Sequence, residues 1–88
     1  MGVMVEMIGR RLRRARAERG ITQVELAART GVAHSTIVRI ERGQARPQLG
    51  TVTKLADALG TDEKWLAFGN GDWFVGQDGE RQREDEDE

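Results

Sequence analysis

Short segments with helical periodicity, most of them closed by a glycine, restrict the fold of this chain more than any other feature. Apolar residues recur at helical spacing, and no run alternates as a half-buried strand does. The segments expected to be helical are about 6–19, 23–30, 34–42, 48–59 and 62–68. Connections of about two to six residues join them. The sequence therefore predicts a compact all-α domain of five short helices.

Local signals set several of these boundaries. Thr22 and Glu25 have the spacing of a capping box, in which each side chain binds the backbone N–H of the other residue. Gly31 is expected to take the left-handed conformation that closes the second helix. Thr61 is expected to cap the fifth helix, and Leu49 is expected on the apolar face of the fourth.

The charges divide the chain into two parts. Residues 1–76 hold twelve Lys and Arg against eight Asp and Glu, whereas residues 77–88 hold two against seven, and the whole chain has a net charge of −1. A basic body with an acidic tail points to a nucleic-acid partner. We expect residues 1–76 to form the folded domain and residues 77–88 a disordered tail. That tail either serves solubility or competes weakly with phosphates for the arginine-rich face.

Composition disfavours several other classes of protein. The chain has no cysteine, which excludes disulfides and thiolate sites and suits a reducing cytoplasm. No stretch approaches the roughly twenty apolar residues of a membrane span, and the N-terminus lacks the order of a signal peptide. His34 is the single histidine, and no third group is placed to orient it. We therefore expect a cytoplasmic protein that is not an enzyme and has no metal or cofactor site.

The stretch 23–42 carries the pattern that points to function. Its apolar and glycine positions have the spacing of a helix-turn-helix, in which two helices pack across a tight turn. A small residue lies where the helices approach closely, and a glycine supplies the left-handed turn. The residues of this pattern are Leu26, Ala27, Gly31, Val32, Ile37 and Ile40. A plain helical bundle that holds these residues by coincidence is the disfavoured alternative.

With these residues the chain resembles the lambdoid phage repressor and Cro family, also called XRE-type helix-turn-helix regulators. The resemblance covers about residues 8–71, and its clearest parts are 8–13, 20–27, 37–43, 55–60 and 65–69. It implies a five-helix DNA-binding domain in which the second and third helices form the helix-turn-helix and the third lies in the major groove of duplex DNA. The implied function is transcriptional regulation by a homodimer on a short operator. An antitoxin-like subunit, with a protein partner and autoregulatory DNA binding, is the alternative.

The resemblance also implies roles for individual residues. Base reading is implied for three positions of the third helix, His34, Ser35 and Arg39. Contacts to the DNA backbone are implied for Gln23, Thr36, Arg42, Gln44 and Arg46. Gln23 is also expected to brace the third helix, and Arg16 is expected to pair with Glu41 for a structural purpose. Arg11 or Arg14 is a further candidate for phosphate contact.

Two positions depart from the family pattern. Ala33 stands where the family often has Ser or Thr before the third helix, so one capping bond should be missing at a cost of about 0.5–2 kcal/mol. Gly50 lies in the first turns of the fourth helix and lowers its helix propensity. Neither departure alters the predicted fold.

Aromatic residues gather at the end of the predicted domain. We expect them to form core and interface contacts between two copies and not a ligand cage. The residues expected at that interface are Trp65, Phe68, Trp73, Phe74 and Val75.

Overall fold

The computed structural model describes residues 3–69, with their side chains from Met7 onward. Within this part of the chain the secondary structure is entirely helical, which confirms the predicted all-α fold of five helices. The helices are α1 (Val3–Arg19), α2 (Gln23–Thr30), α3 (His34–Glu41), α4 (Leu49–Leu59) and α5 (Glu63–Phe68). Three expected interface residues, Trp73, Phe74 and Val75, and the acidic segment 77–88 lie outside the described residues.

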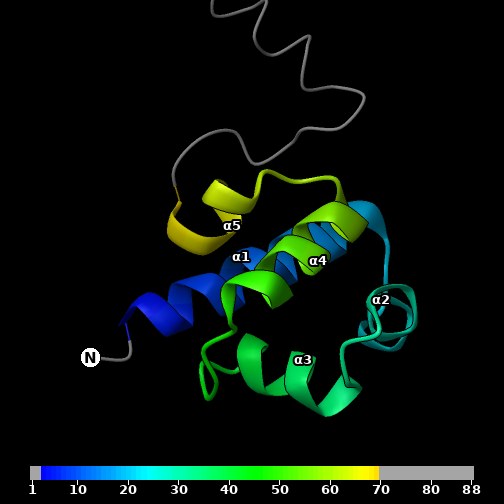
Figure 1. The fold of residues 1–88 in the computed structure, drawn as a ribbon, viewed down its shortest axis with the longest axis horizontal. Helices are drawn as coiled ribbons and strands as arrows, with labels where there is room; N and C mark the ends of the chain where they lie inside the picture. The colour runs from blue at the N-terminus through cyan, green and yellow to red at the C-terminus, as the bar shows by residue number, and fades with distance from the viewer. Residues whose placement is uncertain (1–2, 70–88) are drawn as a thin grey trace, which may run out of the picture.

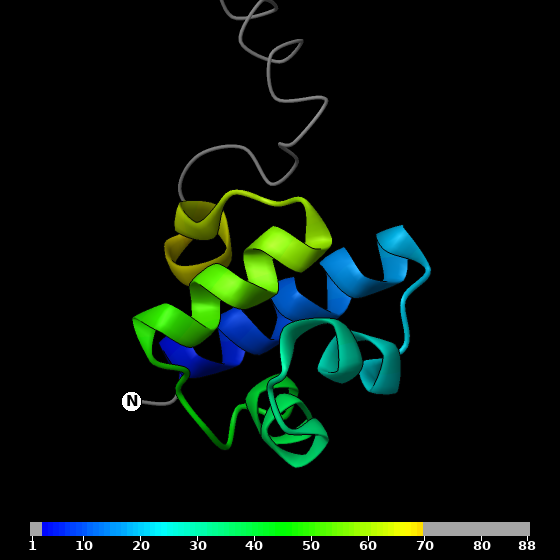
Figure 2. The ribbon, with the colours of Figure 1, turned by 45° about the vertical axis from the view of Figure 1, so that its right-hand side comes forward.

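The central helix of the domain is α1, which packs against α3, α4 and α5. Figures 1 and 2 show α3 at the bottom of the domain and α5 on the opposite side, and α1 contacts both of these helices. No helix within residues 3–69 is long and apolar enough to cross a bilayer.

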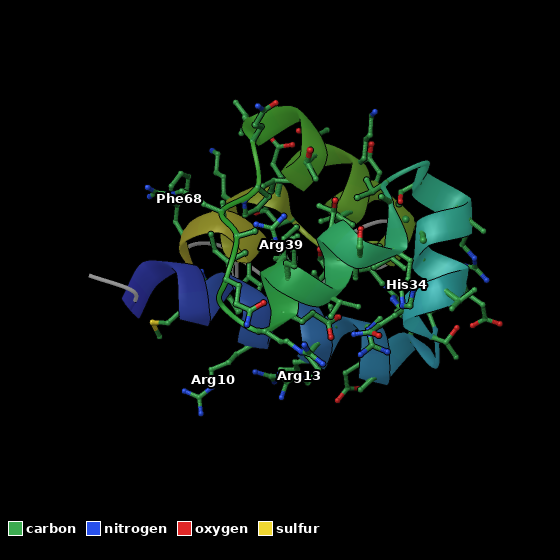
Figure 3. The ribbon with its side chains drawn as sticks, turned by 90° about the horizontal axis from the view of Figure 1, so that it is seen from below. Arg10, Arg13, His34, Arg39 and Phe68 are labelled. Atoms are coloured by element: carbon green, nitrogen blue, oxygen red, sulfur yellow. The ribbon has the colours of Figure 1, made fainter. Side chains whose placement is uncertain are left out.

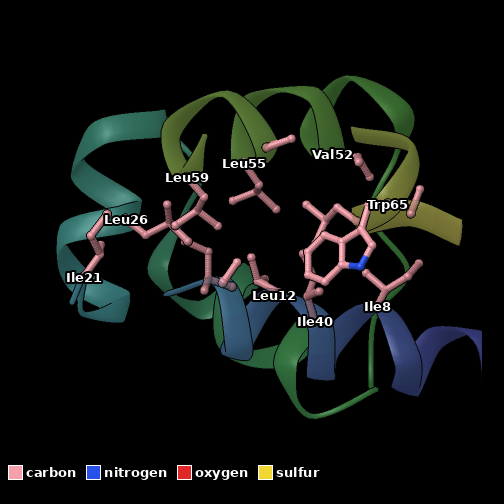
Figure 4. Packing of buried hydrophobic residues seen from close by; sticks show 14 residues of the cluster. Ile8, Leu12, Ile21, Leu26, Ile40, Val52, Leu55, Leu59 and Trp65 are labelled. Atoms are coloured by element: carbon pink, nitrogen blue, oxygen red, sulfur yellow. The ribbon is translucent and has the colours of Figure 1, made fainter. Parts of the chain in front are cut away.

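One apolar core holds the five helices together (Figure 4). Every helix contributes to it, and the helical periodicity seen in the sequence corresponds to the buried faces. The buried apolar residues are Ile8, Leu12, Ala15, Ile21, Leu26, Ile37, Ile40, Val52, Leu55, Ala56, Leu59, Trp65, Leu66 and Ala67.

The predicted boundaries of α2 are confirmed. Oγ1 of Thr22 accepts from the backbone N–H of Glu25 at 3.0 Å, and Oε1 of Glu25 accepts from the N–H of Thr22 at 2.9 Å, so the capping box is complete. Gly31 closes the helix at φ 77°, in the left-handed region. These local contacts fix where α2 begins and where the chain turns toward α3.

Two expectations for α4 and α5 are wrong. Leu49 is the first residue of α4, and 66% of its surface is exposed because the core is filled by residues from Val52 onward. Asp62, and not Thr61, caps α5, since its side chain accepts from the N–H of Lys64 at 3.0 Å. Thr61 is instead buried, and its hydroxyl oxygen has no hydrogen-bond partner among the described residues.

Two arginines of α1 cap the C-terminal ends of α4 and α5. Arg11 donates to the carbonyl oxygens of Leu66 and Ala67, at 2.9 and 3.1 Å, at the end of α5. Arg19 donates to the carbonyl of Leu59 at 2.7 Å, at the end of α4. The last carbonyls of a helix lack partners within it and carry partial negative charge, so a guanidinium stabilises them. Arg11, one of the two sequence candidates for a further phosphate contact, is thus bound to the end of α5, and its burial there lowers its pKa.

A glycine lets α1 approach α3 closely. A Cβ atom at Gly9 would lie 2.4 Å from the carbonyl oxygen of Ile40 and 2.8 Å from that of Glu41. Both are backbone atoms, so a side chain at this position would force the helices apart. Arg13 adds to the same contact by donating to the carbonyl of Glu41 at 3.2 Å. The end of α3 is thus held tightly against α1.

Candidate nucleic-acid interface

The helix-turn-helix is formed by α2 and α3, joined by a three-residue connection that begins at Gly31. Leu26 of α2 and both Ile37 and Ile40 of α3 are fully buried, which fixes the two helices to each other and to the core. Val32, in the connection, is partly buried against the same cluster. With one face of α3 packed in this way, its opposite face is left on the outside of the domain.

The exposed face of α3 carries the three residues predicted to read bases. His34, Ser35 and Arg39 are all exposed. Figure 3 shows His34 and Arg39 toward opposite ends of α3, on the side of the domain that faces the viewer. The structure therefore brings the three side chains onto one helix surface without any of them being needed for the core.

The residues predicted to contact the DNA backbone flank this face. Arg42, Gln44 and Arg46 follow α3 and are exposed, whereas Gln23 and Thr36 are half-buried. α3 ends at Glu41, one residue earlier than predicted, so Arg42 belongs to the loop. Exposed guanidinium and amide groups beside a reading helix are suited to phosphate contacts, which set the register of a protein on the duplex.

Arg10 and Arg13 are interface candidates that sequence reasoning missed. Together with Glu41 and Arg42 they line an open hollow of about 380 Å³ between α1 and the end of α3. All three arginines are exposed, and Figure 3 shows Arg10 and Arg13 along the border of the face formed by α3. Both belong to the basic run 10–14, in which the sequence singles out only Arg11 or Arg14 for phosphate contact. The close approach at Gly9 and the hydrogen bond from Arg13 to the carbonyl of Glu41 place Arg10 and Arg13 next to α3.

Glu41, the last residue of α3, is buried, with 5% of its surface exposed. Its carboxylate binds side chains from both α1 and α2. Arg16 binds it in a fork: Nε donates to Oε2 at 2.7 Å, and Nη2 donates to Oε1 at 3.0 Å. The predicted structural pair is therefore present. This hydrogen bonding to Glu41 raises the pKa of Arg16. Nε2 of Gln23 donates to Oε1 of Glu41 at 3.0 Å, which ties the start of α2 to the end of α3.

The start of α3 is held by fewer bonds than its end. Ala33 occupies the N-cap position and provides no side-chain hydrogen bond, as predicted. The side chain of His34 lies 3.3 Å from Gln23, measured from Nε2 of the ring to Oε1 of the amide. Gln23 therefore contacts both ends of α3, through Glu41 and through His34.

The predicted interface residues of α5 do not share one environment. Trp65 is 8% exposed and belongs to the core of the single chain, so it is not free to contact a second copy. Phe68 is 59% exposed at the end of α5. It lines an apolar hollow of about 230 Å³ together with Leu49, whose exposure the sequence did not predict. Met7 is a further exposed apolar residue, from α1.

The fold and the exposed face of α3 define a helix-turn-helix DNA-binding domain. The HTH_3 helix-turn-helix family matches residues 12–66. The chain belongs to this family, which confirms the resemblance to XRE-type regulators.

Relatives of the chain are named as transcriptional regulators. The uncharacterized HTH-type transcriptional regulator y4dJ of Sinorhizobium fredii is 39% identical over 57 residues, which cover 65% of this chain and 74% of the relative. The immunity repressor protein of Bacillus phage phi105 is 40% identical over 53 residues, which cover 60% of this chain and 37% of the repressor. Both relatives carry the names of regulators, in line with the match to the helix-turn-helix family.

Solved structures show the same fold. The restriction-modification controller protein C.AhdI from Aeromonas hydrophila superposes with a TM-score of 0.68 at 35% identity, covering 70% of this chain and 94% of that protein. An HTH_3 family transcriptional regulator from Vibrio cholerae gives a TM-score of 0.70 at 28% identity, covering 74% of this chain and 36% of the regulator.

Proposed function

We propose that the protein is a sequence-specific DNA-binding transcriptional regulator that acts in the cytoplasm as a homodimer on a short operator. The observation that carries this proposal is the exposed polar face of α3, which presents His34, Ser35 and Arg39 while its opposite face is buried. Arg10, Arg13 and Arg42 lie beside that face and suit the phosphates that flank a major groove. The test is selection of bound sequences from a random DNA library, followed by footprinting of the selected site.

A regulator is favoured over an antitoxin-like subunit. The chain covers 94% of C.AhdI, which is named as a controller protein. An antitoxin-like subunit would have a protein as its main partner. Purification of the chain alone distinguishes the two, since a regulator should be stable and bind its operator without a second protein.

Replacement of Arg39 with alanine is expected to remove sequence preference more than total affinity. A guanidinium can bind O6 and N7 of guanine together, and loss of such a contact costs about 1–3 kcal/mol at the specific site. Binding to random DNA should change much less, because phosphates dominate it. Titration of both DNAs at one salt concentration provides the measurement.

Arg29→Ala is the matched control for this experiment. Arg29 is also exposed, but it lies at the end of α2 beside Asp57 and Ala58. The control should leave the ratio of specific to random binding unchanged. Equal losses on both DNAs for Arg39→Ala would show that Arg39 contacts phosphate and does not read a base.

The homodimer is expected to form through the apolar surface at the end of α5. Phe68 and Leu49 are both more than half exposed and line the same hollow. Exposed apolar residues that cluster in this way are typical of interfaces between proteins. A single reading helix spans too few base pairs for useful specificity, so two half-sites about one helical turn apart are the expected operator.

Phe68→Ala is expected to weaken dimerisation by about tenfold or more, because an aromatic side chain at the centre of an interface contributes strongly to its affinity. Analytical ultracentrifugation measures the dimer dissociation constant. Val24→Ala serves as control, since Val24 is 62% exposed on α2, in a different part of the surface. An unchanged dimer in the Phe68 variant, or a footprint of one half-site, would contradict the proposed interface.

A further inference from the structure

Three side chains form a hydrogen-bonded chain that leads from the buried carboxylate of Glu41 to the exposed face of α3. Nε2 of Gln23 donates to Oε1 of Glu41 at 3.0 Å. Oε1 of the same amide lies 3.3 Å from Nε2 of His34. The inner end is fixed by the fork from Arg16, which binds both oxygens of Glu41. An exposed residue of the candidate reading helix is thus connected to a buried ion pair.

The chemistry of these groups fixes the direction of each hydrogen bond. An ionised carboxylate only accepts, so the NH₂ group of Gln23 must face Glu41. The opposite orientation of the amide would place two oxygens 3.0 Å apart with no proton between them. The oxygen of Gln23 is therefore turned toward His34. An amide oxygen also only accepts, so Nε2 of His34 is the donor.

We propose that this chain holds neutral His34 in the tautomer with its proton on Nε2, and that His34 consequently reads DNA as a hydrogen-bond acceptor. A neutral imidazole has one proton, so placing it on Nε2 leaves Nδ1 with a free lone pair. Within residues 3–69, the His34 ring makes its hydrogen bond to Gln23 through Nε2. Nδ1 is then the ring nitrogen available to a ligand.

The inference rests on the proposed function, in which α3 faces base edges in the major groove. There the amino groups of adenine and cytosine donate, whereas O6 and N7 of guanine and O4 of thymine accept. An acceptor at His34 therefore favours adenine or cytosine at the base that it contacts. Arg39 carries donors alone and favours guanine. The two ends of α3 are expected to select bases of opposite hydrogen-bonding character.

The first experiment measures the tautomer without DNA. His34 is the single histidine in the chain, so ¹⁵N-labelled histidine gives two ring-nitrogen signals in an NMR spectrum of the whole protein. At a pH at which the ring is neutral, the wild type should show Nε2 protonated and Nδ1 unprotonated. In Gln23→Ala the proportion of the other tautomer should rise by about fivefold, the effect of losing one ordinary hydrogen bond.

Gln48→Ala is the control, since Gln48 is exposed and its side chain makes no capping bond to α4. It should leave the tautomer ratio at the wild-type value. A wild-type ring protonated mainly on Nδ1, or equal ratios in the wild type and Gln23→Ala, would overturn the inference. Circular dichroism of each variant verifies that the helices are intact.

The second experiment compares DNA selection by the wild type, His34→Ala and Gln23→Ala. Both variants are expected to lose about fivefold of the preference for adenine or cytosine at one and the same base pair. If Gln23 acts on phosphate alone, Gln23→Ala will weaken all sequences equally and the inference is wrong. Absence of any sequence preference in the wild type would instead refute the proposed function, while the NMR result would still decide the tautomer.

Discussion

Replacement of Glu41 with glutamine is expected to lower the free energy of unfolding by about 3 kcal/mol. The side chain of Glu41 is 3% exposed and that of Arg16 is 18% exposed, so the substitution leaves a largely buried guanidinium without its counter-charge. Breaking a buried ion pair from one side costs about 3–5 kcal/mol. The expected value lies at the lower end of this range for two reasons. Arg16 is partly exposed to water, and the new amide can still accept a hydrogen bond from it.

Urea denaturation followed by circular dichroism measures this effect. The matched control is Glu18→Gln, which removes a charge of the same kind from an exposed position on α1. The control should shift the free energy of unfolding by no more than about 0.5 kcal/mol, as surface substitutions generally do. Similar values for the two variants would show that Glu41 does not stabilise the fold through its charge.

Gly9→Ala is expected to destabilise the protein by about 2–3 kcal/mol and to weaken DNA binding as well. The new methyl group would meet two backbone carbonyl oxygens of α3 at distances no Cβ atom tolerates, so α1 and α3 must separate. Forcing an extra methyl into a closely packed contact costs about 1–3 kcal/mol. The same separation would widen the hollow lined by Arg10, Arg13 and Arg42, which changes where their guanidinium groups meet phosphates.

Gly50→Ala is the matched control and should have the opposite sign. A Cβ atom at Gly50 meets nothing within 4 Å, and the residue lies inside α4. Alanine has a higher helix propensity, so this variant should be more stable by up to about 1 kcal/mol. Thermal unfolding measures the stability of both variants. A gel-shift titration on the selected operator measures their DNA affinity. A Gly9 variant as stable as the Gly50 variant would refute the tight contact between α1 and α3.

Features set by neighbouring residues in the sequence were predicted well. The capping box at Thr22 and the turn at Gly31 each depend on a few consecutive residues, so their spacing was sufficient. The cap of α5 failed because Thr61 and Asp62 are adjacent and both suit that position. The choice between them is made by burial: Thr61 packs into the domain, which leaves Asp62 to bind the first turn.

Features that depend on contacts distant in sequence were not predicted. The run 10–14 reads as one basic cluster, yet α1 directs Arg11 to the end of α5 and Arg13 to the end of α3. Nothing in the local pattern distinguishes these two arginines. The candidate positions on α3 came from the resemblance, and the structure places His34, Ser35 and Arg39 on the exposed surface of that helix. The hydrogen bond between Gln23 and His34 was not predicted, because it depends on how α2 packs against α3.

The capping role of the α1 arginines changes how strongly DNA affinity should depend on salt. Each phosphate neutralised by a cation releases condensed counterions, and the slope of log affinity against log salt is about −0.9 for each. Arg11, Arg16 and Arg19 are bound to carbonyl and carboxylate oxygens of the protein itself and are not available for this exchange. The number of ions released on binding should therefore follow the exposed arginines around α3, and the slope should be shallower than the arginine content of the domain implies.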